Sequence, residues 1–357
     1  MKMSFRWYGE TDPISLQYIR QIPNMRSIVS AVYDVKPGEV WPEESIAKMK
    51  KQCEENGLVF DVVESIPVHE DIKLGRNNVE HLLDVYCENI RRCAKYGVKC
   101  VTYNFMPVFD WTRTQLDKKA PDGSTSLVMY WEQMKGLDPL KDDIHLPGWD
   151  SSYTQDEVRE LISAYGEIGE EGLWKNLEKF LKKVIPVAEE CGVRMAIHPD
   201  DPPFPVLGLP RIVTSEEDIE WFLSAVDNPH NGLTFCAGSL SAGAHNDVVQ
   251  MARKFAARTH FIHLRSCHIF ENGDFTEASH LGGRADIVEL VRIFEKQNPD
   301  LPMRVDHGMT MLGDESRGYN AGYSFLGRMF AMGQVQGIIA TVDNELGINY
   351  KITGFYE

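Results

Sequence analysis

The sequence VRMAIH, from Val193 to His198, has the pattern of a buried β-strand that ends on a histidine, and PDDPP follows it up to Pro203. A nearly continuous apolar run is typical of a strand that is covered on both faces. Asp and Pro are common in turns, so one interpretation is a structural turn beside a hydrogen-bonded histidine. The other is a metal or catalytic centre at the carboxyl end of the strand.

Seven more stretches have the apolar and β-branched character of strands. They are Met3–Trp7, Arg26–Tyr33, Leu58–Ile66, Lys99–Phe105, Gly232–Gly238, Thr259–Arg265 and Pro302–His307. Apolar residues with a 3.6-residue period predict helices between them, as in residues 79–94 and 173–188. Thr154 with Glu157, and Thr214 with Glu217, have the spacing of a capping box at a helix start.

Strands that alternate with helices predict a (β/α)8 TIM barrel, as a single domain over residues 1–357. A doubly wound open sheet is the alternative, although no glycine-rich dinucleotide motif follows an early strand. The alternation stops from about residue 106 to 172, in polar sequence such as DWTRTQLDKKAPDGSTS (110–126) and KGLDPLKDDIHLPGWD (135–150). We expect an insertion after the fourth strand that lies over the carboxyl ends of the strands as a lid.

Composition and charge exclude several classes of function. The 357 residues are 43% hydrophobic and 25% charged, as in globular proteins, and the net charge of -16 argues against binding nucleic acid. No apolar stretch approaches the roughly 20 residues of a membrane span, and MKMSFRWYGETDP lacks the apolar core of a signal peptide. Seven cysteines without a Cys-x-x-Cys pair are typical of a reduced cytoplasm. We therefore expect a cytoplasmic protein that acts on small molecules.

A residue able to bind a metal stands at the end of each of the last four predicted strands. These residues are His198, Cys236, His263 and Asp306. In a barrel the carboxyl ends of the strands converge, and two imidazoles, a thiol and a carboxylate make a plausible set of four ligands. Taken singly, each could be a core histidine, a small buried cysteine or a turn aspartate. Their recurrence on successive strands favours a metal site.

Five other residues have both a functional and a structural interpretation. His307 follows a predicted ligand and Tyr323 stands near the start of the last predicted helix, so either could be catalytic or serve packing. Arg265 could bind a substrate carboxylate with its planar fork, or form an internal ion pair. Trp7 and Tyr8 could form a wall of the pocket or belong to the core.

Long motifs over almost the whole chain resemble the mannonate dehydratase family of hexuronate degradation. They are FRWYG (5–9), PGEVW (37–41), VESIPVHEDIK (63–73), YNFMPVFDWTRT (103–114), VRMAIHPDDPPFPVLGLPRIV (193–213), THFIHLRS (259–266), HLGG (280–283), MRVDHG (303–308) and GYSFLGR (322–328). The resemblance implies a xylose-isomerase-like TIM barrel. It also implies a hydro-lyase that converts D-mannonate to 2-dehydro-3-deoxy-D-gluconate and water with Mn²⁺, or Fe²⁺ in some members.

By position in these motifs, the family's metal ligands fall on His198, Cys236, His263 and Asp306, and its catalytic residues fall on His307 and Tyr323. His280 joins Arg265, Trp7 and Tyr8 as an expected substrate contact. A histidine has a near-neutral reference pKa, which favours His307 as the base and Tyr323 as the acid. Barrels of this class often associate, so we expect a homodimer. A sugar or sugar-acid isomerase or epimerase with the same ligands is the alternative enzyme, and a sugar-acid-binding protein with a structural metal is the alternative outside enzymes.

Overall fold

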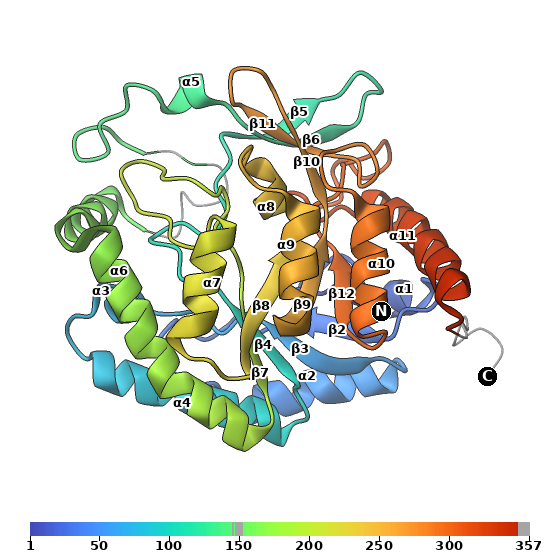
Figure 1. Cartoon of the computed structure of the whole chain (residues 1–357), viewed down its shortest axis with the longest axis horizontal. Coiled ribbons are helices and arrows are strands. Elements are labelled where there is room, and N and C mark those ends of the chain that lie inside the picture. The colour runs from blue at the N-terminus through green and yellow to red at the C-terminus, as the bar shows by residue number, and fades with distance from the viewer. Residues whose placement is uncertain (145, 147–152, 349–357) are drawn as a thin grey trace.

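Eight short parallel strands close into a barrel in a computed structural model that describes residues 1–144, 146 and 153–348 (Figure 1). They are β1 Lys2–Arg6, β2 Ser27–Ser30, β3 Val59–Glu64, β4 Cys100–Tyr103, β7 Arg194–Ile197, β8 Asn231–Cys236, β9 Thr259–Leu264 and β12 Pro302–Val305. The order around the barrel is β1-β12-β9-β8-β7-β4-β3-β2, and β1 pairs with both β12 and β2. The predicted barrel is confirmed, and the open sheet is wrong because the two ends of the sheet pair.

Helices surround the barrel and bury their apolar faces against it (Figure 1). Those of the main ring and its connections are α1 Leu16–Arg20, α2 Glu43–Glu55, α3 Glu70–Leu74, α4 Val79–Lys95, α6 Gln155–Cys191, α7 Glu216–Ala225, α8 Ala237–Ala242, α9 Val248–Phe255, the 3-10 turn Ala256–Arg258, α10 Ile287–Gln297 and α11 Phe325–Leu346. Among the described residues, no helix combines the length and apolar composition that crossing a membrane requires.

Side chains cap two helices close to where the sequence predicts it. Thr154 and Glu157 form the predicted capping box at the start of α6. The box predicted from Thr214 and Glu217 is wrong by one residue, because Ser215 is the N-cap of α7 and Asp218 is its acidic partner. The Thr214 hydroxyl also donates to the Asp218 carboxylate, at 2.7 Å.

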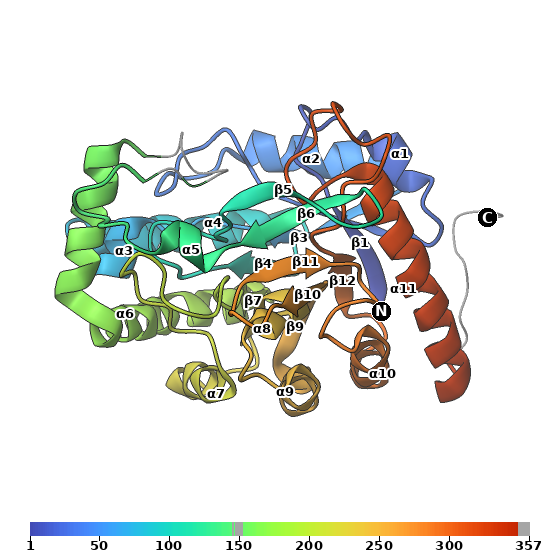
Figure 2. The ribbon, with the colours of Figure 1, turned by 90° about the horizontal axis from the view of Figure 1, so that it is seen from above.

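A second sheet of four antiparallel strands lies at the carboxyl ends of the barrel strands, and we call it the cap sheet. It consists of β5 Gln115–Lys119, β6 Thr125–Met129, β10 Ser266–Ile269 and β11 Phe275–Ala278, in the order β10-β11-β6-β5. Figure 2 shows these strands from above, in front of the barrel strands. The β5–β6 hairpin belongs to the predicted insertion, whereas the sequence pattern did not predict β10 and β11, which follow β9.

The rest of the predicted insertion, residues 106–172, contains the short helix α5 Trp131–Met134 and the first turns of α6. Gly169 interrupts α6 with a φ of 59°, in the left-handed region that favours glycine. The interruption lies close to the predicted end of the insertion. Residues 145 and 147–152 of this segment lie outside the described residues.

Candidate metal centre and active site

The four predicted ligands meet inside the carboxyl end of the barrel. One ligand atom of each of His198, Cys236, His263 and Asp306 lies within 4.8 Å of the others. His198 Nε2 is 3.2 Å from His263 Nδ1. Asp306 Oδ2 is 3.6 Å from His263 Nδ1 and 3.9 Å from Cys236 Sγ. The strand ends therefore converge as predicted, and the four side chains could hold a metal ion.

The neighbours of the two histidines fit a metal site. His198 Nδ1–H donates to the carbonyl oxygen of Pro199 at 2.7 Å, so the Nε2 atom faces the cluster. His263 Nε2 lies 3.3 Å from Glu64 Oε1, so its Nδ1 atom faces the cluster. Each ring therefore turns one nitrogen towards the place where a cation would bind. Burial opposes the charge of His198, but Cys236 and Asp110 outweigh burial and raise the pKa of His198 to about 9, so a metal that binds Nε2 displaces a proton.

The charged neighbours of Cys236 favour the thiolate form of its side chain. Burial opposes its ionisation, but Arg265 and His198 outweigh burial and lower the pKa of Cys236 well below its usual range. The Ser239 hydroxyl donates to Sγ at 3.1 Å. Two imidazoles, a thiolate and a carboxylate are a ligand set that divalent transition metals accept.

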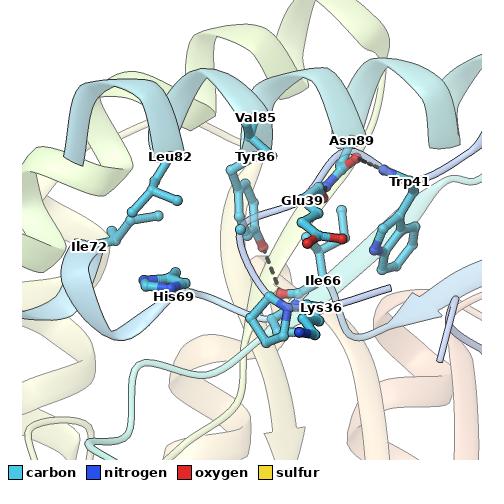
Figure 3. A pocket seen from close by; sticks show the side chains of 13 residues that line it. Lys36, Glu39, Trp41, Ile66, His69, Ile72, Leu82, Val85, Tyr86 and Asn89 are labelled. Atoms are coloured by element: carbon cyan, nitrogen blue, oxygen red, sulfur yellow. Dashed lines mark hydrogen bonds between the residues drawn. The ribbon is translucent and has the colours of Figure 1, made fainter. Parts of the chain in front are cut away.

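A cavity of about 200 Å³ opens beside the four ligands, and His198, Asp306, His307 and Tyr323 line it. Two other hollows fit a sugar acid less well. The first hollow lies between α4 and the loops after β2 and β3 (Figure 3). Its volume of about 10 Å³ is enough for one water molecule. Asn89 and Tyr86, which line it, form hydrogen bonds with backbone atoms of these loops. The other, of about 390 Å³, lies at the amino ends of the strands, opposite the face that carries active sites in TIM barrels.

The two predicted catalytic residues stand side by side on the cavity wall. The rings of His307 and Tyr323 are 5.2 Å apart between centroids and almost perpendicular. The Tyr323 hydroxyl donates to Asp306 Oδ1 at 3.2 Å. His307 Nδ1 lies 3.1 Å from Glu277 Oε1. Burial opposes the charge of Glu277, but Arg265 and Arg113 hold its pKa below the usual range, so an ionised carboxylate faces Nδ1.

The family model of D-mannonate dehydratase (UxuA) matches residues 1–349. The chain belongs to the D-mannonate dehydratase family. It is 45% identical over 344 residues to a mannonate dehydratase of Streptococcus uberis, covering 95% of this chain and 99% of that protein. It is also 41% identical to the crystal structure of mannonate dehydratase from Streptococcus suis serotype 2, with a TM-score of 0.91 over 99% of this chain and 97% of the other.

The fold is also similar to that of a xylose isomerase domain protein from Planctomyces limnophilus. The TM-score is 0.55 at 9% identity, over 97% of this chain and 98% of the other. At this identity the likeness concerns the fold alone. The predicted family and the predicted xylose-isomerase-like barrel are both confirmed.

The residues predicted to contact the substrate divide into two groups. Tyr8 and Arg265 line the cavity, whereas Trp7 and His280 do not. Side chains alternate along an extended chain, and Trp7 accordingly packs in the core with 5% of its surface exposed. His280 is 3% exposed, and its Nε2 atom has no hydrogen-bond partner among the described residues.

A buried ion-pair network around the ligands was not predicted. Arg304 donates to Glu64 from Nε and Nη2 at 3.0 and 2.8 Å, and to Asp306 Oδ1 from Nη1 at 2.5 Å. Both new residues carried a signal in the sequence. Arg304 shares a strand face with Asp306, and Glu64 ends its strand as the four ligands end theirs.

Proposed function

We propose that this chain is a hydro-lyase that removes water from D-mannonate to give 2-dehydro-3-deoxy-D-gluconate. The observation that carries this proposal is the cluster of His198, Cys236, His263 and Asp306 directly beside His307 and Tyr323, in a chain that belongs to the D-mannonate dehydratase family. The streptococcal relatives of similar length are named mannonate dehydratase.

The four ligands would hold Mn²⁺, with Fe²⁺ as the alternative. The choice of Mn²⁺ rests on the family resemblance, because a thiolate ligand by itself favours softer metals. When bound there, a divalent cation supplies a positive charge that stabilises negative charge on substrate oxygens.

The reaction needs a base at C2 of the sugar acid and an acid at the hydroxyl that leaves C3. We assign His307 as the base, because the Glu277 carboxylate accepts a hydrogen bond from Nδ1–H and leaves the Nε2 lone pair available. Tyr323 keeps a hydroxyl proton that it donates to Asp306, and burial, with Tyr8 and Asp306, raises its pKa well above 10. A protonated hydroxyl at this place suits the role of acid.

Two predicted substrate contacts, Tyr8 and Arg265, line the cavity and would touch the substrate or the groups that hold it. Trp7 and His280 do not line it and would act only through neighbouring residues. We further propose that residues 1–357 form one domain and that the insertion at 106–172 acts as a lid, since its β5–β6 hairpin is half of the cap sheet.

A homodimer and a cytoplasmic location complete the proposal. The outer face of α11 exposes Leu326, Met329 and Phe330, with 58% of Phe330 accessible, and a second copy would cover this apolar face. Light scattering of the protein and of its Phe330→Glu variant tests the dimer, because a charge there should shift the mass to that of a monomer. All seven cysteines are unpaired, which is compatible with a reducing compartment.

Metal-stripped protein incubated with D-mannonate, with and without Mn²⁺, tests the reaction. Formation of a 2-keto-3-deoxy acid only with metal supports the proposal. A product of unchanged mass would identify an isomerase or epimerase instead. Tight metal binding without any turnover would favour a sugar-acid-binding protein with a structural metal.

A further inference from the structure

Among the described residues, three arginines line the cavity: Arg6, Arg265 and Arg304. A guanidinium is the side chain best suited to bind a carboxylate with two parallel hydrogen bonds. Which arginine meets a substrate carboxylate depends on which one has donors left. All three nitrogens of Arg304 already donate to Glu64 and Asp306.

Arg265 is also occupied by protein groups. Its Nη1 atom donates to Glu277, and its Nη2 atom donates to Asp201 and to the Ser239 hydroxyl. Its Nε atom lies 2.9 Å from Asp306 Oδ2, although the N–H bond is not aligned for a hydrogen bond. A substrate carboxylate beside Arg265 would therefore meet three carboxylates that already neutralise it.

Arg6 differs from both. Its Nη1 atom is 3.2 Å from Glu64 Oε2, the single carboxylate within ion-pair distance among the described residues. Its buried Nε atom has no hydrogen-bond partner. Glu64 is meanwhile bound through both oxygens by Arg304. Arg6, with 12% of its side chain exposed, is thus a largely buried cation that shares one carboxylate and has donors to spare.

The surroundings of Arg6 place these donors near the reacting groups. The guanidinium carbon of Arg6 is 5.0 Å from the ring centroid of Tyr8. Between ring centroids, Tyr8 is 5.3 Å from Tyr323, and Tyr323 is 5.2 Å from His307. These four side chains follow one another along one wall of the cavity. In an aldonate, C2 is bonded directly to the carboxylate carbon, so a carboxylate on this wall brings C2 towards the proposed acid and base.

We propose that Arg6 binds the carboxylate of the sugar-acid substrate. This inference rests on the proposed function and gives the site a residue that distinguishes sugar acids from neutral sugars. The planar fork can donate to both carboxylate oxygens, while the aromatic rings of Tyr8 and Tyr33 hold the guanidinium in place.

The test compares metal-loaded wild-type protein with Arg6→Gln and Arg6→Lys. Loss of a charged hydrogen-bonded pair should lower kcat/KM for D-mannonate about 10- to 100-fold in Arg6→Gln, mainly through KM, with the inhibition constant of the product rising in parallel. Arg6→Lys keeps the charge without the fork and should raise KM roughly fivefold. Folding should survive because Glu64 retains both of its bonds to Arg304.

Arg265→Lys is the matched variant at the rival arginine. It should lower metal content and thermal stability, because Arg265 contacts the ligand Asp306 and three other protein groups. A KM in Arg6→Gln within twofold of the wild-type value, at equal metal content, overturns the proposal, as does a rise in KM confined to Arg265→Lys. Should Arg6→Gln fail to fold, an unchanged KM in Arg6→Lys has the same meaning.

Wild-type turnover separates this inference from the proposed function. If the wild-type protein does not convert D-mannonate, the proposed function fails by itself. Calorimetric titration of D-mannonate into the metal-loaded wild type and Arg6→Gln then tests Arg6. Weaker binding in the variant supports the inference, and equal affinity, or no binding to the wild type, overturns it.

Discussion

The Glu277 carboxylate on β11 of the cap sheet lies 3.1 Å from Nδ1 of His307, which follows β12 of the barrel. The cap sheet, and not the barrel, therefore supplies the acceptor that fixes the tautomer of the proposed base. Arg113 and Arg265 donate to the same carboxylate and keep it ionised and in place. An ionised carboxylate there would also stabilise the imidazolium that forms when His307 takes a proton.

Replacing Glu277 by Gln should lower kcat by about 10- to 100-fold, because the negative charge beside His307 disappears. KM should change less, since Glu277 does not line the cavity. Steady-state kinetics with D-mannonate, together with metal analysis of the purified variant, measure this effect.

Asp201→Asn is the matched control for Glu277→Gln. Asp201 also pairs with Arg113 and Arg265, but it makes no hydrogen bond or ion pair with His307 among the described residues. Both variants should lose stability, because each leaves two buried arginines with one carboxylate fewer. An equal loss of kcat in the two variants would show that the arginine cluster, and not the tautomer of His307, sets the rate.

His307→Asn and Tyr323→Phe should each lower kcat by about 10²- to 10⁴-fold while metal content stays close to that of the wild type. Neither side chain is among the four proposed ligands. Tyr8→Phe is the comparison, because it removes the hydroxyl of a proposed substrate contact on the same wall, 5.3 Å away between ring centroids, that makes no bond to Asp306. It should therefore change KM more than kcat. Near wild-type turnover in His307→Asn or Tyr323→Phe would exclude that residue from acid–base chemistry.

The four ligands could be predicted from the sequence because each stands where an apolar strand run ends. Parallel strands of a barrel bring their carboxyl ends together, so local sequence and topology suffice to gather His198, Cys236, His263 and Asp306. The same rule applied to the third strand would have found Glu64. Alternation along the first strand would have separated Tyr8, on the cavity side, from Trp7 in the core.

Glu277 could not be found in this way. It reaches His307 because β11 pairs with β6, in the register Phe275 to Met129, which joins segments almost 150 residues apart in the chain. No local pattern in the sequence specifies that pairing. The spare donors of Arg6 likewise become visible only when the partners of Glu64, Arg265 and Arg304 are known.

Oxidation should inactivate the protein through Cys236. Its pKa is lowered, whereas burial raises the pKa of each of the other six cysteines, Cys53, Cys87, Cys93, Cys100, Cys191 and Cys267. The thiolate is the form that peroxide attacks. We expect activity and bound metal to fall together on treatment with hydrogen peroxide, as measured by turnover and metal analysis of the same samples. Cys267→Ser should remain equally sensitive, and inactivation with the metal fully retained would contradict the role of Cys236.

His260 should weaken the fold at acidic pH. Burial lowers its pKa to about 4, while its ring donates from Nδ1 to the Met195 carbonyl and accepts at Nε2 from Arg194. An unfolded chain protonates this histidine near pH 6.5. Between pH 6.5 and 4 the unfolded state therefore binds a proton that the folded state does not. The folded state loses up to about 3 kcal/mol as the pH falls through this window, and nothing from this group above it.

Urea denaturation of the wild type and of His260→Gln at pH 7.5 and pH 4.5 measures this contribution. The amide of Gln can bond to Met195 and Arg194 without titrating, so the free energy of unfolding should fall less between the two pH values in the variant. Burial also lowers the pKa of His280 to about 4. Because His280 is present in both proteins, its contribution to the free energy of unfolding cancels in the comparison. An identical loss in wild type and variant would mean that His260 is already protonated in the folded state at pH 4.5, or that water reaches its ring.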